Sequence, residues 1–533
     1  MPLRFIIKLY WNVRKGKEMK YIFKMEEHEL WWGGTSTDGI ISPFDKSTVL
    51  KHDFRVLADN QSMPMYISNM GRCIWSEEPF EVSFLSGEIK IIGKDVIIEN
   101  FGNTLRDAYT GASKKYFPQK GEKLPEKFFT TPQYNTWMQL VYDQSQKGVM
   151  NYAKNIIKNG FAPGILIIDE GWQKDYGKWQ FDEIKFPEPK KMIDELHAMG
   201  FTVMLWVVPF VGTDGKDYAM RVFKGLSPDK YQQNFLRNEN GKPLITEWWN
   251  GYSSILDFTN EYDKEYLDSQ LQSLIDEFSI DGFKFDGGCL ASYCDTRAVN
   301  GPINKMYTPA QRNIAWNEFG LKYSYHEYKD TFKGGGKRCI QRLFDKFHSW
   351  DNNGLNTLIP NALSAGLMGY PFICPDMIGG GEWTIRENNQ RVDMELFVRM
   401  AQCSALFPMM QFSWAPWEAV DKQHLKYIKD AHDLHIRFAD RFRALVEQCY
   451  KDNEPVLRSL EYNYPHCGFE RVKDMFMLGN DILAAPVIVK GQKVRKVTLP
   501  QGKWKGFNGI EYYGNKTYEI PVTLADTVYF TKM

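Results

Sequence analysis

The sequence predicts an α/β protein, a (β/α)₈ TIM barrel flanked by an N-terminal β-sandwich and a small C-terminal β-sandwich. Three observations predict this class. Residues 20–125 alternate apolar and polar side chains between frequent turns, without a long helical period. From about residue 130, short apolar strands alternate with amphipathic helices, and from about residue 450 strands and turns return. We therefore expect domains at residues 1–125, 126–448 and 449–533.

The bulk composition narrows the classes of function. Of 533 residues, 43% are apolar and 25% charged, as in ordinary globular proteins. Lys plus Arg and Asp plus Glu both number 66, so the basic excess typical of nucleic-acid binders is absent and no nucleic-acid partner is expected. The 16 Trp residues indicate either a large aromatic core or surfaces on which sugar rings stack.

The eight cysteines form no CxxC or zinc-ligand spacing, so no metal is expected. Unpaired-looking cysteines favour a reducing compartment, which predicts a cytoplasmic location and leaves the periplasm as the alternative. The first 18 residues contain an apolar core that Lys8 interrupts and that is too short to span a bilayer. They are expected to be a dispensable leader or a first strand, with Met19 as an alternative start.

The N-terminal segments "MPMYISNMGRCIWSEE" and "FEVSFLSGEIKIIG" show the period of two that is typical of antiparallel strands. The central region then repeats strand–helix units, in which nearly continuous apolar strands predict a parallel sheet covered on both faces. Seven or eight such units over roughly 320 residues fit a barrel with insertions. A doubly wound open sheet is the alternative, and the absence of GxGxxG after a first strand weakens it.

Functional side chains of a (β/α)₈ barrel stand at the carboxyl ends of its strands. The candidates found there by sequence are Asp169, Glu170, Trp172, Trp206, Pro209, Asp286, Arg342, Asp345, Trp350, Asp351, Asp376, Gln411, Ser413 and Trp414. Any one of these Asp residues alone is more often a helix cap or a turn former. Several carboxylates at one barrel mouth, without metal-ligand spacing, instead indicate the paired acid/base and nucleophilic chemistry of glycoside hydrolysis.

The stretch "DGFKFDGG" holds the most informative strand end. Lys284 and Asp286 are two residues apart on one strand, so both side chains point to the same side. A neighbouring Lys lowers the pKa of a carboxyl group and keeps it ionised, as a nucleophile requires. A plain Lys–Asp pair inside the barrel is the structural alternative.

These residues resemble glycoside hydrolase family 31, whose members are retaining α-glycosidases. The resemblance runs from about residue 20 to the end and rests on "GFKFD", "IIDEGW", "WWNGYSSILDFTN", "GYPFICPDMIGGG" and "FMLGNDILAAPVI". The wording "LNTLIPNALSAGLMGYPF" looks closest to the subgroup of that family that includes bacterial α-galactosidases.

The resemblance implies Asp286 as nucleophile and Asp351 as general acid/base. Asp169 and Glu170 would bind sugar hydroxyls. The remaining residues expected to bind substrate are Trp206, Trp249, Lys284, Arg342, Trp350, Asp376, Ser413 and Trp414.

The sequence departs from the family pattern in two places. Ser413 stands in "QFSW" where many members have the His of an Arg-x-His motif. The loop before the acid/base is short, so Asp345 is the alternative to Asp351. Asp351 is favoured because it lies in an Asn-rich loop beside Trp350, whereas Asp345 falls within a predicted strand.

These features predict a retaining exo-α-glycosidase that needs no cofactor, acts on an oligosaccharide or glycoside and prefers α-galactosides. An α-glucosidase, an α-xylosidase, a transglycosylase and a catalytically silent carbohydrate-binding protein are the alternatives. A homo-oligomer is left open.

Overall fold

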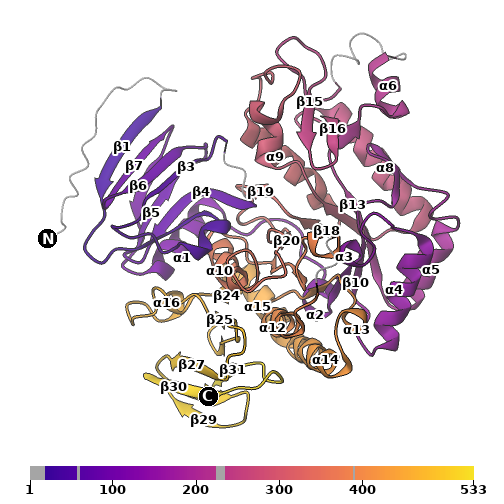
Figure 1. Ribbon diagram of the computed structural model, residues 1–533. Coiled ribbons are helices and arrows are strands. Elements are labelled where there is room, and N and C mark those ends of the chain that lie inside the picture. Colours follow the sequence, from indigo (N-terminus) through magenta and orange to yellow (C-terminus); the bar gives the residue numbers. More distant parts are fainter. Residues whose placement is uncertain (1–17, 57–59, 224–233, 388–390) are drawn as a thin grey trace.

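The computed structural model describes residues 18–533 except 57–59, 224–233 and 388–390. Figure 1 shows three parts: an N-terminal pair of sheets beside the barrel, the barrel with its helices, and a C-terminal group of strands below. The first 17 residues of the predicted leader lie outside the described residues, and the first strand begins at Met19.

The N-terminal part is the expected β-sandwich. One sheet has the order β1-β7-β6-β3, formed by Met19–Lys24, Glu88–Gly93, Glu81–Leu85 and Leu50–Asp53. The other has the order β19-β4-β5-β8, formed by Thr331–Phe332, Gln61–Ser68, Arg72–Trp75 and Ile97–Asn100, with β2 (Trp31–Thr35) also paired to β4. Side chains of both sheets share one apolar cluster, which contains Tyr66 and Ile74 from one sheet and Val82 and Ile91 from the other.

The central sheet is parallel and curls into a barrel. Its order is β21-β20-β18-β17-β13-β10-β9-β23-β22. The strands in chain order are β9 Gln133–Asn135, β10 Ile165–Ile168, β13 Thr202–Val207, β17 Gly282–Phe285, β18 Tyr325–Tyr328, β20 Gln341–Arg342, β21 Ile373–Cys374, β22 Met377–Ile378 and β23 Gln411–Phe412.

The nine strands occupy eight positions, because β21 and β22 are two halves of one strand that breaks at Pro375-Asp376. The first half pairs with β20 and the second half pairs with β23, which in turn pairs with β9. The two ends of the sheet are therefore neighbours in the chain, and the barrel closes through the segment that carries Asp376. This confirms the (β/α)₈ expectation.

Helices cover the outside of the barrel (Figure 1). The main ones are α4 Gln146–Lys158, α5 Pro189–Ala198, α8 Glu261–Phe278, α9 Pro309–Phe319, α10 Leu358–Leu367, α12 Met394–Ser404, α14 Lys422–Arg437 and α15 Ala439–Asp452. Polar caps start several of them: Ser145 accepts from the N–H of Gly148 in α4, and Thr308 forms a capping box with Gln311 in α9.

The C-terminal part is the predicted small sandwich. Its larger sheet has the order β24-β25-β26-β31-β28-β29, formed by Leu457–Arg458, Phe476–Leu478, Ile482–Ala484, Tyr529–Lys532, Lys503–Gly506 and Glu511–Tyr513. Its smaller sheet pairs β27 (Val494–Leu499) with β30 (Lys516–Pro521). A separate apolar cluster that includes Trp504 and Phe530 fills the space between them.

Two further observations concern the whole chain. Within the described residues, no helix combines the length and the apolar character that crossing a bilayer would need. All eight cysteines are unpaired, and only Cys467 is exposed.

Candidate active site

A cavity of about 280 Å³ lies at the carboxyl ends of the barrel strands. Its wall combines acidic, basic and aromatic side chains. The lining residues are Trp137, Tyr142, Asp169, Glu170, Trp249, Lys284, Asp286, Lys329, Arg342, Asp345, Met377, Gly381, Glu382 and Trp383. Six of the residues expected from the sequence to be catalytic or to bind substrate thus meet in one place: Asp169, Glu170, Trp249, Lys284, Asp286 and Arg342.

Asp286 follows β17 and is only 8% exposed. Its Oδ2 accepts from the Trp206 indole at 3.1 Å, and its Oδ1 accepts from the N–H of Gly287 at 2.8 Å. Burial opposes its charge, but the positive charges of Lys329, then Lys284 and Arg342, hold its pKa below the ordinary value. Asp286 is thus held as a carboxylate.

Lys284 acts on Asp286 through space, because its hydrogen-bond partner is a different carboxylate. Its Nζ donates to Oδ2 of Asp169 at 2.7 Å, and both side chains are buried. The amide of Asn135, on the neighbouring strand β9, donates to the same oxygen at 2.6 Å. Asp169 is thereby fixed between two strand ends, with its charge paired.

Glu170 has a different environment. It is 3% exposed, and its oxygens accept from the Tyr176 hydroxyl at 2.6 Å and from the Trp249 indole at 3.2 Å. Burial, and after it the charges of Asp169 and Asp286, raise the pKa of Glu170 to about 7 despite these hydrogen bonds. Near neutral pH this carboxyl group is therefore partly protonated.

Arg342 joins the strand β20 to the break in the seventh strand. Its Nη1 donates to Asp345 at 2.7 Å and to Asp376 at 2.5 Å. The other carboxylate oxygen of Asp376 accepts from the N–H groups of Lys346 at 2.7 Å and Gly381 at 3.1 Å. Asp376 has φ of 121°, a conformation that L-residues rarely adopt, so these contacts hold a strained main chain at the break between β21 and β22.

Lys329 is the lining cation that the sequence reasoning missed. That reasoning also missed Trp137, Tyr142, Met377, Gly381, Glu382 and Trp383. Lys329 directly follows β18, a four-residue strand with His and Glu inside, which the apolar pattern did not reveal. Its ammonium group pairs with Asp345. Burial opposes charge on Asp345, but Lys329 and Arg342 together hold the pKa of Asp345 well below its ordinary value.

The structure does not bring Asp351 into the cavity wall. Asp351 is exposed, and its Oδ1 accepts from the Ser349 hydroxyl at 2.7 Å and the N–H of Asn353 at 2.8 Å, as in a turn. Neighbouring Trp350 donates to Asp393 at 3.0 Å. Asp345 is the member of this pair of candidates that lines the cavity.

The other expected substrate residues do not line the cavity. Trp206 is fully buried and contacts Asp286, while Asp376 holds Arg342. Ser413 is also fully buried, and its hydroxyl accepts from the N–H of Met138 at 2.7 Å, so it braces the main chain. Trp414 is 8% exposed and does not line the cavity.

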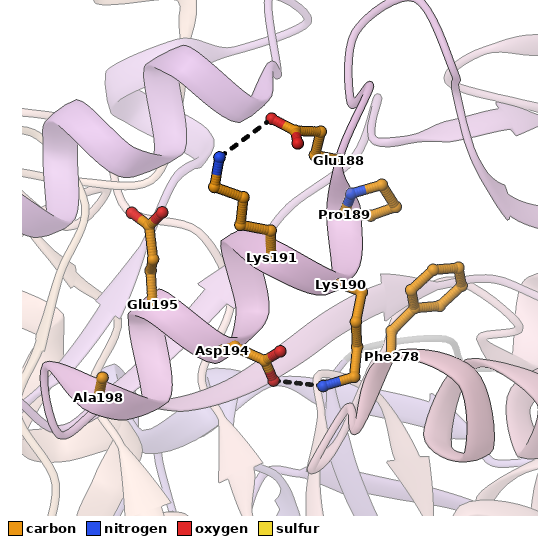
Figure 2. A pocket seen from close by; sticks show the side chains of 8 residues that line it. All are labelled: Glu188, Pro189, Lys190, Lys191, Asp194, Glu195, Ala198 and Phe278. Carbon is orange, nitrogen blue, oxygen red and sulfur yellow. Dashed lines mark hydrogen bonds and ion pairs between the residues drawn. The ribbon is translucent and has the colours of Figure 1, made fainter.

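A second depression lies on the outer surface between α5 and Phe278 of α8 (Figure 2). Four of its charged side chains pair locally, Lys190 with Asp194 and Lys191 with Glu188, and Glu195 also lines it. Among the described residues, ligand atoms suited to a cation meet within 4.8 Å at Glu461, His466 and Glu470, and none of these three lines the cavity.

Comparison with known families decides what this barrel is. The model of the "Glycosyl hydrolases family 31 TIM-barrel domain" matches residues 124–443, more than half of the chain. The chain belongs to glycoside hydrolase family 31. The model of the "Glycosyl hydrolase family 31 C-terminal domain" matches residues 453–532. The resemblance seen in the sequence is therefore confirmed.

Individual relatives within family 31 cover much of the chain. The mouse "Myogenesis-regulating glycosidase" is 30% identical over 435 residues, or 78% of this chain and 58% of that protein. An "Alpha-glucosidase" of Saccharolobus solfataricus is 24% identical over 422 residues, 69% of this chain and 58% of that protein. This chain thus spans less than two thirds of both relatives.

A solved structure supports the fold. The family 31 dextranase of Flavobacterium johnsoniae, complexed with glucose, superimposes with a TM-score of 0.82 at 17% identity, covering 98% of this chain and 67% of that one. At this identity the likeness concerns the architecture.

Proposed function

We propose that the protein is a retaining exo-acting α-glycosidase with Asp286 as its nucleophile. The observation that carries the proposal is the buried Asp286 carboxylate, aligned by two donors and faced by three cations in a cavity of about 280 Å³. A cavity of this size suits the terminal sugar of a chain better than a long polymer.

In the first step, an oxygen of Asp286 forms an ester bond to the anomeric carbon. The bond to the leaving oxygen breaks, and that oxygen takes a proton from a second carboxyl group. In the second step, the same group removes a proton from water, which attacks the anomeric carbon and releases Asp286.

Three carboxyl groups are candidates for the proton transfer, and each is supported by a different observation. Asp351 follows from the resemblance to the family. Asp345 lines the cavity, although two cations favour its ionised form. Glu170 lines the cavity with a pKa raised to about 7, which suits a proton donor near neutral pH.

Leaving groups of graded acidity separate these candidates. Replacing the true acid (D351N, D345N or E170Q) should reduce kcat/KM by about 10²–10⁴-fold on alkyl or sugar aglycones, and much less on nitrophenyl aglycones that need little protonation. A variant that loses activity equally on all aglycones is not the acid. If none of the three variants loses more activity on alkyl or sugar aglycones than on nitrophenyl aglycones, none of these carboxyl groups is the acid and the two-step mechanism above is excluded.

We propose α-galactosides as the preferred substrates. The support is that Ser413 stands where many family members have a His. The Ser413 hydroxyl accepts from the main-chain N–H of Met138, so other side chains must bind the sugar hydroxyl that the His would bind. The relative named an alpha-glucosidase favours the second candidate, α-glucosides. The two sugars differ at the 4-hydroxyl, and a pocket built around one epimer leaves polar groups unpaired with the other.

A panel of p-nitrophenyl α-glycosides tests the proposal: galactoside, glucoside, xyloside and N-acetylgalactosaminide. We expect the highest kcat/KM on the galactoside and loss of several orders of magnitude in D286N, because the amide that replaces the carboxylate cannot form the ester. Preference for the glucoside would contradict the substrate, and inactivity on all four would favour a silent carbohydrate-binding protein. Chromatography of products separates hydrolysis from transfer to a sugar acceptor.

The location in a reducing compartment, as in the cytoplasm, also stays a proposal. Its support is that all eight cysteines are unpaired.

A further inference from the structure

Two amide side chains of the N-terminal sandwich reach the carboxyl ends of the barrel strands. Asn60 immediately precedes β4, and Gln61 is the first residue of that strand. Both are buried, at 4% and 0% exposure. Besides contacts with Ser36 inside the sandwich, both amides form hydrogen bonds with main-chain groups of two barrel segments, those around the ends of β18 and β20.

Asn60 connects the two segments directly. Its Nδ2 donates to the carbonyl of Lys329 at 2.5 Å, and its Oδ1 accepts from the N–H of Phe344 at 2.9 Å. One planar amide thus fixes a carbonyl after β18 relative to an N–H after β20.

Gln61 repeats the connection. Its Nε2 lies 3.0 Å from the carbonyl oxygens of Lys329 and Arg342, and 3.2 Å from Oε1 of Gln341. The Ser36 hydroxyl donates to the side-chain Oε1 of Gln61 at 3.1 Å and orients the side-chain amide. Because the group is buried, these bonds are not exchanged with water.

The main-chain pairing between the two barrel segments is short. β17 and β18 pair over four residues, whereas β18 and β20 share the single pair Tyr328 and Gln341. Beyond that pair, side chains join the two segments: Lys329 pairs with Asp345, the Thr331 hydroxyl donates to Oε1 of Gln341 at 3.2 Å, and Arg342 lies 3.6 Å from Glu327. The two amides therefore hold the main chain where strand pairing has almost ended.

The groups on these segments are the ones that face Asp286. Lys329 comes from the end of β18, while Arg342 and Asp345 come from the end of β20. Lys284, on the strand β17 that precedes Asp286, and Glu170, which follows β10, complete the charged surroundings of Asp286. Among the cations, Lys329 is the strongest influence on the Asp286 carboxylate.

We propose that Asn60 and Gln61 are positioning residues, which hold Lys329 and Asp345 at the cavity so that the ammonium group of Lys329 acts on the Asp286 carboxylate. This inference rests on the proposed function of Asp286 as nucleophile. It gives the N-terminal sandwich a part in the chemistry, although neither amide lines the cavity.

The test compares variants that remove the two amides with a matched control. N60G removes the side chain and tolerates the φ of 48° at this position, and Q61L keeps a similar shape without hydrogen bonds. N69A is the control: Asn69 is equally buried, at 3% exposure, and its amide binds Leu30 and His28 within the sandwich.

We expect kcat of N60G and Q61L to fall about tenfold or more, and the acid limb of their kcat/KM profile to move up by about one pH unit. The sign follows from charge: when Lys329 withdraws, burial of Asp286 is less compensated, its pKa rises, and the carboxylate needs a higher pH. N69A should lower the thermal midpoint without moving the limb. In a K329M background, N60G should shift the limb no further.

A lowered thermal midpoint with an unmoved acid limb in N60G and Q61L would overturn the inference and leave a purely structural contact. Hydrogen exchange provides a readout that does not depend on turnover. N60G should raise exchange in residues 325–346 relative to N69A, and equal exchange in both would also overturn it. If the wild-type protein turns over no glycoside but exchange rises as expected, the proposed function fails and the positioning of Lys329 stands.

Discussion

At the scale of single residues, Glu170 differs from Asp169 and Asp345 because its side-chain hydrogen-bond donors are a phenol and an indole rather than cations. Its pKa of about 7 means that it is protonated below neutrality and ionised above it. A protonated carboxyl group donates a hydrogen bond, whereas the ionised form only accepts. The charge of the cavity therefore changes in the pH range where most enzymes are assayed.

This environment predicts how activity responds to pH. With an alkyl α-glycoside, whose leaving oxygen needs a proton, kcat/KM of the wild-type protein should fall as pH rises through about 7, since Glu170 then loses the proton that it would donate. E170Q stays uncharged, so its profile should be flat between pH 6 and 8. The measurement is kcat/KM from pH 5 to 9, with E382Q, at the same cavity, as the control that keeps the wild-type limb. Superimposable limbs in E170Q and the wild-type protein would exclude Glu170 as the titrating group.

The individual residues also show how far the sequence could predict the site. Asp286, Asp169 and Arg342 were found because barrel geometry places strand ends together, which needs only the strand pattern. Lys329 was missed because β18 contains His326 and Glu327, both buried, so its pattern is not apolar. Asp351 was expected at the cavity from the family resemblance and its Asn-rich loop. The structure places it outside the wall, because the position of a loop is not encoded in any sequence period.

At the scale of elements, β17 packs against β18 with no space for a side chain at its start. A Cβ added to Gly282 would lie 1.8 Å from the carbonyl oxygen of Tyr325, which is main chain and cannot rotate away. The glycine is therefore required for the approach of the strand that carries Asp286 to the strand that precedes Lys329.

G282A should consequently destabilise the barrel by about 3 kcal/mol, through overpacking against main chain. G148A is the matched control, because its Cβ would meet only the terminal carbons of Leu140 at 3.1 Å and the Ser145 hydroxyl at 3.2 Å. In the first turn of α4, Ala in place of Gly should be neutral or gain about 0.5–1 kcal/mol. Thermal unfolding followed by circular dichroism compares the two, and equal midpoints would show that β17 can move away from β18.

Elements were predicted well where a period exists and poorly where it is broken. The helices α4, α5 and α8 and the longer strands follow their apolar spacing. Asp376 was expected at the end of a strand, whereas in the structure the seventh strand resumes after it as β22. The break falls at Pro375-Asp376, because proline lacks the N–H that a strand ladder needs. Both halves nevertheless keep the expected place in the barrel.

At the scale of the whole molecule, the three parts share interior contacts. Phe332 of β19 packs in the apolar cluster of the N-terminal sandwich, with its ring 6.3 Å from that of Phe54. Arg399 of α12 donates to the carbonyls of Thr523 and Asp526 in the C-terminal part. The domain boundaries after residues 125 and 448 stay a prediction from the sequence.

The parallel pairing of β19 with β4, Thr331 with Gln61 and Phe332 with Ser62, has a consequence for biosynthesis. On the ribosome, β4 emerges long before β19 has been translated. The N-terminal sheet must therefore wait with the first residues of β4 unpaired on one side and a gap in its core where Phe332 belongs, a condition that favours misassociation of nascent chains. Completion of the first domain thus depends on a late segment of the second, and the chain cannot mature strictly from its N-terminus to its C-terminus.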